Sequence, residues 1–243
     1  MRTVLITGVG SGIARATAEQ FLLAGDAVIG IDREQGRAGE LAERFPSFSL
    51  VRHDLLETAG YGVISDHLRE RGRRADVLVN CAGIREIRPA LELGLDEWNR
   101  VFAVNVTAAF LLSQLFVRQL EGPGAIVNVS SVSGLLAEPA RAAYVSSKHA
   151  LIGLTKQLAM EFGARGIRVN AVAPGVVRTE LTEAYFDDPE QVALLHAAHA
   201  LGRVAAPDEI ASAILFLASD AASFMTGTIM TVDGGWTAGK VIK

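Results

Sequence analysis

The sequence predicts an α/β protein built as a doubly wound sheet, with about seven mostly parallel strands and helices on both faces. Short apolar, β-branched runs recur along the chain with helical patterns between them, which is typical of a parallel sheet. The first two runs enclose a glycine-rich turn and a helix, and polar residues directly follow most runs. Half of the 243 residues are hydrophobic, enough for a full core. No linker or repeat suggests a second domain, so residues 1–243 are assigned to one domain.

The N-terminal unit predicts a dinucleotide site. The apolar run Thr3–Thr7 leads into Gly8-Val9-Gly10-Ser11-Gly12, and a helical pattern follows over residues 13–24. The second apolar run, residues 27–31, ends at Asp32. Glycines allow a tight turn, and a helix start offers N–H groups to a pyrophosphate. This order is typical of a Rossmann-type unit.

Asp32 predicts the type of cofactor. An acid roughly 20 residues after the glycine-rich turn can accept a hydrogen bond from a ribose 2′-OH, and its charge repels a 2′-phosphate. Arg33 favours the opposite choice, because a guanidinium can meet a 2′-phosphate or stack on adenine. We expect Asp32 to dominate, so NAD is predicted over NADP.

The alternation continues towards the C-terminus. Further strands are expected over residues 48–53, 76–79, 125–129, 166–171 and 228–232. Helices are expected over residues 57–72, 96–120 and 144–162, with Asp96 as the cap of the long middle helix, and Asp188 and Pro189 begin another. Parallel strands end at one edge of the sheet. The residues expected to gather there are Asp32, Asp54, Asn80, Ser131, Pro174 and Gly175.

Tyr144 and Lys148 are the strongest catalytic candidates. Four residues apart on a helix, they share one face. A nearby ammonium favours the phenolate and lowers a pKa that starts near ~10, which makes a tyrosine an acid/base catalyst. The alternative is an amphipathic helix that merely carries both residues. With four Lys against nineteen Arg in the chain, the placement of a Lys favours catalysis, because Arg is too basic to share a proton.

Composition argues against several classes of function. A net charge of -4 and a pI near 5.8 disfavour nucleic-acid binding. The single cysteine, Cys81, excludes an internal disulfide and suits a reducing compartment. Gly8 ends the first apolar run too early for a signal peptide, and the most apolar helical pattern is interrupted by Asn105, Thr107, Ser113 and Gln114. We therefore expect a cytoplasmic protein without a membrane span.

Taken together, the motifs resemble the classical short-chain dehydrogenases/reductases over essentially the whole chain. The motifs are Thr7-Gly8-Val9-Gly10-Ser11-Gly12-Ile13, Asp54, Asn80-Cys81-Ala82-Gly83, Asn105, Ser131, Tyr144-x-x-x-Lys148, Pro174-Gly175 and Thr179. There are two departures from the family pattern. Ala14 replaces a usual Gly and should be tolerated. Cys81 replaces a usual Asn, and we interpret it as a small buried residue, not a nucleophile.

The resemblance implies roles for the site residues. Tyr144 would exchange a proton with the substrate oxygen, Lys148 would bind the nicotinamide ribose, and Ser131 would hold the substrate oxygen. Asn105 would position a water that links Lys148 to solvent, unless it bonds a neighbouring strand. The implied cofactor contacts are Gly8, Ser11, Gly12, Ile13, Asp32, Asp54, Leu55, Asn80, Ala82, Gly83, Tyr144, Lys148, Pro174, Gly175, Val177 and Thr179.

The family's range implies a secondary alcohol and ketone pair on a small polar substrate such as a sugar, hydroxy acid or cyclic diol. Two alternatives stay open: a 3-oxoacyl-thioester reductase that uses NADPH, and a catalytically silent dinucleotide-binding sensor. The substrate loop corresponds to residues 180–202. Arginines near the mouth could bind an anionic substrate or simply be solvated. These are Arg85, Arg88 and Arg141.

The last two expectations concern metals and assembly. His196 and His199 have a spacing that can hold a metal but lack a third ligand, so no metal site is predicted. By resemblance, the protein is expected to be a homotetramer in which the helices over residues 96–120 and 144–162 pack against partner copies.

Overall fold

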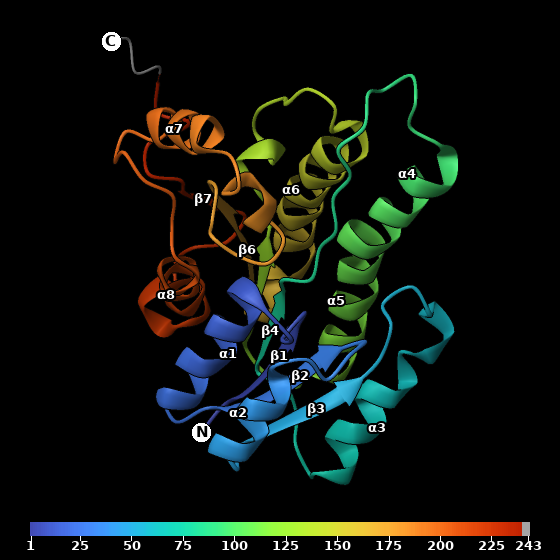
Figure 1. Cartoon of the computed structure of the whole chain (residues 1–243). Coiled ribbons are helices and arrows are strands. Elements are labelled where there is room, and N and C mark those ends of the chain that lie inside the picture. The colour runs from blue at the N-terminus through green and yellow to red at the C-terminus, as the bar shows by residue number, and fades with distance from the viewer. Residues whose placement is uncertain (240–243) are drawn as a thin grey trace.

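A computed structural model describes residues 1–239 and shows a single sheet of seven strands with helices on both faces (Figure 1). The strand order is β3-β2-β1-β4-β5-β6-β7, and every pairing is parallel. This confirms the predicted doubly wound sheet. The strands are β1 Thr3–Thr7, β2 Ala27–Asp32, β3 Phe48–Arg52, β4 Val77–Asn80, β5 Gly124–Val129, β6 Ile167–Pro174 and β7 Ile229–Val232.

Alternate side chains of β1 pack into two separate hydrophobic cores. Val4 and Ile6 belong to one cluster, whereas Leu5 between them belongs to the other. Successive strand side chains point to opposite faces, so each face receives its own apolar set. The first cluster is covered by α1 Gly12–Leu23, α2 Ala38–Arg44 and α8 Pro207–Ala218. The second is covered by α3 Gly62–Glu70, α5 Ala108–Gln119 and α6 Ala142–Phe162.

The long middle helix differs from its prediction in two ways. It consists of α4 Leu95–Phe102 and α5, joined by a π-helical turn over Ala103–Thr107. The N-cap position is Gly94, and Asp96 lies inside the first turn. The prediction of Asp96 as the cap is therefore wrong, although an acid in the first turn still stabilises the positive end of the helix dipole.

Two helices, α2 and α8, were not anticipated. In α8, Pro207 opens the helix, and the Glu209 carboxylate accepts a hydrogen bond from the Ala206 N–H at 2.9 Å. Both features are ordinary helix-start signals in the sequence. Ile210, Ile214 and Leu217 are completely buried against the first core. β6 also extends to Pro174, beyond the predicted end at residue 171.

α7 runs over Pro189–Ala198, and its predicted start is confirmed. The Asp188 carboxylate accepts a hydrogen bond from the Glu190 N–H at 2.9 Å. This helix lies within the expected substrate loop, at the end of the molecule beyond β7 (Figure 1).

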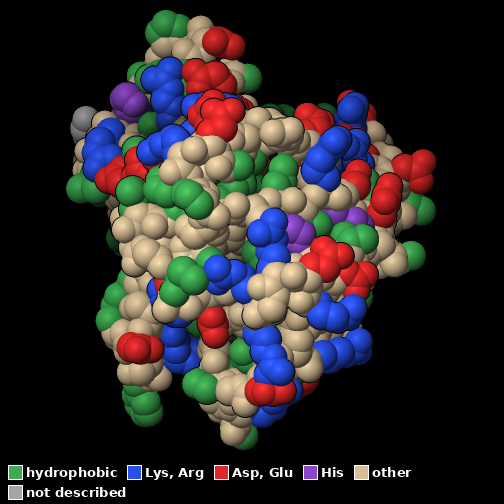
Figure 2. All heavy atoms as spheres, turned by 90° about the horizontal axis from the view of Figure 1, so that it is seen from below, with side chains coloured by type: hydrophobic (Ala, Val, Ile, Leu, Met, Phe, Trp, Pro, Cys, Tyr) green, Lys and Arg blue, Asp and Glu red, His purple; other side chains and the backbone are tan. Residues whose placement is uncertain are grey.

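The segment Leu95–Gln119 is long and apolar enough to cross a membrane by composition alone, with a mean hydropathy of 1.6. In the fold it is a core helix, because Leu112 and Phe116 are fully buried in the second cluster. On the face shown in Figure 2, basic and acidic side chains are interspersed, and no basic patch of the kind that binds nucleic acid is visible there.

Candidate active site

The carboxyl ends of the strands border a cleft at the point where the strand order reverses, between β1 and β4. Two cavities, of about 320 and 270 Å³, share lining residues and so form one continuous cleft. The shared residues are Ile13, Cys81, Gly83, Thr179 and Leu181. This is the position at which open α/β sheets bind their ligands.

The glycine-rich turn forms one wall of the first cavity. Gly8 has φ 81° and Gly12 has φ 53°, a backbone region that side chains disfavour. A Cβ on Gly8 would lie 3.0 Å from the Ala82 Cα, so the turn packs directly on the segment after β4. The turn therefore needs glycine both for its conformation and for close approach.

Asp32 lies at the end of β2 beside this turn. One carboxylate oxygen accepts a hydrogen bond from the Gly10 N–H at 2.9 Å, and the other accepts from the Glu34 N–H at 3.2 Å. Arg33 also lines the cavity, but its guanidinium forms an exposed ion pair with Glu34 at 3.4 Å. The backbone holds the acid in a fixed position, whereas the basic side chain is solvated.

Most predicted cofactor residues lie in the cleft. Those that line the first cavity are Gly8, Ser11, Gly12, Ile13, Asp32, Asp54, Leu55, Ala82, Gly83 and Thr179. Those that line the second cavity include Tyr144, Lys148, Pro174, Gly175 and Val177. The cleft thus has one end at the turn and the other at the Tyr–Lys pair, as an elongated dinucleotide requires.

Asn80 is the exception among these residues. Its side chain is buried, and its amide donates a hydrogen bond to the Asn128 Oδ1 at 2.8 Å. The two residues are register partners on β4 and β5, so their side chains lie side by side on one face of the sheet. Asn80 lines neither cavity, and its place against the ribose stays a prediction.

Tyr144, Lys148 and Ser131 all line the second cavity. The Lys148 ammonium lies 5.6 Å from the centre of the Tyr144 ring and donates a hydrogen bond to the Val129 carbonyl at 2.9 Å. Ser131 caps a short 3-10 turn, where its hydroxyl accepts from the Ser133 N–H at 3.1 Å. The helix spacing and the end of β5 thus bring the three side chains to one place.

The protonation behaviour of the pair differs from the sequence expectation. Burial raises the pKa of Tyr144, and the Ser131 hydroxyl, Arg85 and Arg141 lower it only in part. Burial also lowers the pKa of the Lys148 ammonium to about 8. The predicted depression of the Tyr144 pKa is therefore wrong for the polypeptide by itself, because removal from water outweighs the nearby positive charges.

Asn105 lies buried in the π-helical turn. Its carboxamide oxygen accepts from the Ile84 N–H and its amide donates to the Ile84 carbonyl, both at 2.9 Å. The amide also donates to the Ser147 hydroxyl at 3.0 Å. Asn105 therefore connects the segment after β4 to α6. This resembles the alternative role given above, in which Asn105 bonds a neighbouring strand. Its role in positioning a water stays a prediction.

Glu86 is a site residue that sequence reasoning missed. Its buried carboxylate accepts from the Ala143 N–H at 2.7 Å, and each of its oxygens lies 3.1 Å from the Tyr144 nitrogen. It thus satisfies the first free N–H groups of α6, the helix that carries the catalytic pair. No spacing rule connects a residue to a helix so much later in the chain.

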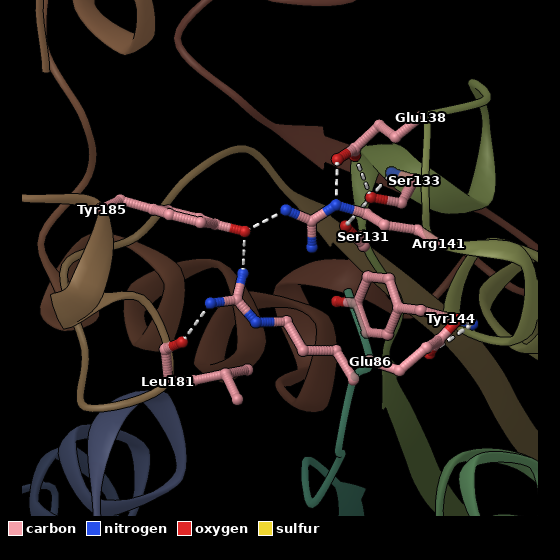
Figure 3. A network of polar contacts seen from close by, with 9 residues as sticks. Glu86, Ser131, Ser133, Glu138, Arg141, Tyr144, Leu181 and Tyr185 are labelled. Atoms are coloured by element: carbon pink, nitrogen blue, oxygen red, sulfur yellow. Dashed lines mark hydrogen bonds and ion pairs between the residues drawn. The ribbon is translucent and has the colours of Figure 1, made fainter. Parts of the chain in front are cut away.

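The arginines divide into two groups. Arg85 and Arg141 line the second cavity, and both donate to the hydroxyl of Tyr185, a residue that the sequence did not single out (Figure 3). Arg88 instead pairs with Glu97 at 2.8 Å and lines neither cavity. The hypothesis of an anion site is wrong for Arg88 but stays open for the other two.

Two further expectations concern Cys81 and the histidine pair. Cys81 is partly exposed and lines both cavities, and burial raises the pKa of its thiol to about 12, which disfavours a nucleophilic thiolate. His199 is buried, and its ring nitrogens bond the Leu195 carbonyl and the Val176 N–H. Among residues 1–239, no three metal-binding side chains cluster together.

The cleft defines a class of protein: an oxidoreductase that binds a nicotinamide dinucleotide beside a tyrosine–lysine pair. Comparison with known proteins agrees. The model of a family described as enoyl-(acyl carrier protein) reductase matches residues 8–237. D-threitol dehydrogenase of Mycolicibacterium smegmatis is 38% identical over 97% of this chain and 93% of its own length. The chain belongs to the short-chain dehydrogenase/reductase family.

Solved structures give the same result. A structure titled 4-hydroxyisoleucine dehydrogenase complexed with NADH superposes with a TM-score of 0.95 at 42% identity, over 99% of this chain and all of the other. A putative NAD(P)-dependent gluconate 5-dehydrogenase from Beutenbergia cavernae, with bound NADP, has a TM-score of 0.93 at 42% identity. It covers 98% of this chain and 97% of its own.

Proposed function

We propose that this protein is an NAD-dependent dehydrogenase that interconverts a secondary alcohol and a ketone on a small polar molecule. The observation that carries this proposal is the convergence of Tyr144, Lys148 and Ser131 on a cavity continuous with the glycine-rich turn. That cavity measures about 270 Å³ and would hold the nicotinamide end of the cofactor as well as the substrate, so the space left suits a small substrate.

The chemistry of this chain's residues follows from their positions. When bound, the cofactor supplies the hydride acceptor. Ser131 orients the alcohol oxygen, and Tyr144 removes its proton as hydride leaves the carbon; in the reverse direction, the phenol returns that proton. Lys148 keeps a positive charge beside the phenol, which favours the phenolate.

The preference for NAD rests on Asp32. Its carboxylate is held at the end of β2 by two backbone N–H groups, in the cavity that begins at the glycine-rich turn. A fixed negative charge there suits a ribose 2′-OH and repels a 2′-phosphate. Related structures carry NADH in one case and NADP in another, so this choice depends on the residues of this chain.

A 3-oxoacyl-thioester reductase is the second candidate, because a 3-oxoacyl-[acyl-carrier-protein] reductase of Salmonella typhimurium is 35% identical over 96% of this chain and of its own length. Asp32 disfavours it, since that activity usually runs on NADPH. The related dehydrogenases are named for threitol, 4-hydroxyisoleucine and gluconate, which are small polar molecules. A silent sensor is disfavoured because Ser131, Tyr144 and Lys148 are all present.

We also propose the homotetramer that family resemblance implies. Phe110 on α5 is 39% exposed and Met160 on α6 is 84% exposed, and these are the helices expected to meet partner copies. Apolar side chains on the outer faces of these helices support the proposal. A cytoplasmic location stays a prediction from the single cysteine.

The proposed function is tested by following cofactor reduction at 340 nm with a panel of secondary alcohols, NAD or NADP, and three proteins: wild type, Asp32→Ala and Asp66→Ala. Asp66 is an exposed acid on α3 that pairs with Arg69, so it serves as the matched control. We expect wild type and control to prefer NAD, and Asp32→Ala to lose at least roughly tenfold of that preference, the equivalent of about 1.4 kcal/mol.

Each contrary result has a distinct meaning. Reduction of neither cofactor with any alcohol would overturn the proposed function. A wild-type preference for NADP would show that Arg33 outweighs Asp32, and the 3-oxoacyl-thioester reductase would become the first candidate.

A further inference from the structure

The second cavity carries an excess of positive charge. Within residues 1–239, its charged lining consists of three cationic side chains and one carboxylate: Arg85, Arg141, Lys148 and Glu138. Glu138 pairs with the Arg141 Nε at 2.9 Å and also accepts from the Ser133 hydroxyl. No carboxylate of the described residues lies within ion-pair distance of Arg85.

Tyr185 lies where the two guanidinium groups converge. Its hydroxyl accepts from both Arg85 and Arg141, and its ring lies 4.4 Å and 5.6 Å from their central carbons. Figure 3 shows Tyr185 reaching towards Arg141 across the space beside Tyr144. A neutral phenol oxygen satisfies hydrogen bonds but compensates neither charge, so Glu138 balances Arg141 and the charge of Arg85 has no carboxylate partner among the described residues.

Two further details show that this arrangement is unusual for surface arginines. The Arg141 side chain is only 13% exposed. Burial lowers the pKa of Arg85, Tyr185 raises it in part, and the neighbouring Arg141 lowers it further. Like charges that are held together inside a cavity favour a bound anion.

We propose that the substrate is a small hydroxy acid, and that its carboxylate binds between Arg85 and Arg141 in place of the Tyr185 hydroxyl. This proposal rests on the dehydrogenase activity proposed above and names its substrate class. Each carboxylate oxygen accepts from one guanidinium, and hydrogen bonds between ionised groups of this kind are about twice as strong as neutral ones. Tyr185, which belongs to the substrate loop, then lies beside the bound acid.

The reaction leaves the carboxylate unchanged. The alcohol carbon loses a hydride, with its two electrons, to the bound NAD, and the alcohol oxygen gives its proton to Tyr144. A C=O bond replaces the C–O bond, so the product is the matching keto acid. The carboxylate fixes the orientation of the chain, which decides the hydroxyl that reaches Tyr144 and Ser131.

A purely structural role is the competing explanation. Arg85 also donates to the Leu181 carbonyl, so it connects the segment after β4 with the substrate loop. A strut of this kind would support every substrate equally, whatever its charge. The two explanations therefore differ in one result: whether the activity lost when Arg85 is replaced depends on the charge of the substrate.

The test uses matched pairs: 3-hydroxybutyrate and 4-hydroxypentanoate, each beside its uncharged amide, with NAD as cofactor. We expect wild type to show a kcat/KM at least roughly tenfold higher for at least one acid than for its amide. In Arg85→Gln, kcat/KM for that acid should fall roughly 10- to 100-fold, mainly through KM, the equivalent of one lost charge-assisted hydrogen bond. The amide should change by less than about threefold.

Arg88→Gln is the matched control, because Arg88 pairs with Glu97 outside the cavity; its values should equal wild type. Equal losses for acid and amide in Arg85→Gln would establish the strut and overturn the proposal. The comparison of acid with amide in wild type needs no variant: oxidation of the amides with no preference for either acid would overturn the carboxylate site and leave the dehydrogenase intact. Oxidation of no alcohol, charged or neutral, would instead contradict the proposed function.

Discussion

Lys148 is a buried cation whose position costs stability. The residue is 3% exposed, and its ammonium donates to the Val129 carbonyl at 2.9 Å. Its pKa falls from 10.5 to about 8 because burial disfavours the charged form. Active sites often keep groups that reduce folding stability because the chemistry requires them.

Lys148→Met should therefore raise the free energy of unfolding while it abolishes activity. The folded state pays for the buried charge at every pH below about 8, and this cost disappears as pH approaches 10.5, where the unfolded chain also loses the proton. We expect a gain on the order of 1 kcal/mol at pH 7, after the lost hydrogen bond to Val129 is included. Chemical denaturation of wild type and variant at pH 7 and at pH 10 measures the difference in their free energies of unfolding at each pH.

A gain that did not shrink between pH 7 and pH 10 would contradict this account of Lys148. Lys156→Met is the control, because Lys156 is an exposed lysine two turns further along α6. It should change stability by no more than about 0.5 kcal/mol at either pH.

For single residues, the sequence motifs indicated which residues gather at the site, but they did not indicate the environment of each side chain. Tyr144 and Lys148 were found because their spacing places them on one face of a helix, whereas Ser131 was identified through the family resemblance. Arg85 and Arg88 could not be told apart, since nothing in an irregular segment fixes which side chain faces the cavity. The direction of the Tyr144 pKa shift was missed because burial depends on the whole fold.

At the scale of elements, α6 is positioned from its N-terminus. Glu86, in the segment after β4, accepts hydrogen bonds from the Ala143 and Tyr144 N–H groups. Asn105 in the π-helical turn donates to Ser147 one turn further along. The helix that carries the catalytic pair is thus held by polar contacts from two other parts of the chain. We consider Glu86 a positioning residue.

Glu86→Gln tests this role. An amide group would turn one N–H donor towards the backbone donors of α6, so we expect a loss of about 1–2 kcal/mol in stability. Displacement of Tyr144 should lower kcat roughly 10- to 100-fold, with the Kd for NADH changed by less than about twofold. Glu92→Gln, at an exposed position in the same irregular segment, is the control. A variant with a lower melting temperature but wild-type kcat would show that Glu86 only stabilises the fold.

Sequence periodicity predicted all seven strands but not every helix. Strands β1, β2, β4, β5 and β6 are almost entirely buried and therefore appear as continuous apolar runs, whereas β3 and β7 at the edges of the sheet are only partly buried. α8 carried recognisable start signals at Pro207 and Glu209 and could have been found. The π-helical turn in the middle helix could not, because it changes the hydrogen bonding without interrupting the apolar pattern.

At the scale of the whole molecule, the fold gathers distant segments around one cleft. The glycine-rich turn, the ends of β2, β4 and β5, the start of α6 and the substrate loop all border it. The parallel sheet explains this, because every strand ends at the same edge. Contacts across the cleft, such as Tyr185 with Arg85 and Arg141, depend on loop conformation, which strand order alone does not specify.

The central claim is that Tyr144 is the acid/base of a dehydrogenase whose cofactor lies in this cleft. The most direct measurement is hydride transfer in a single turnover, with enzyme, NAD and an alcohol substrate, in wild type and Tyr144→Phe. Phe keeps the ring and removes the hydroxyl. We predict that the variant binds NADH with a Kd within about twofold of wild type, while the rate of NADH formation falls at least roughly 10²-fold. A variant that forms NADH within tenfold of the wild-type rate would contradict the account.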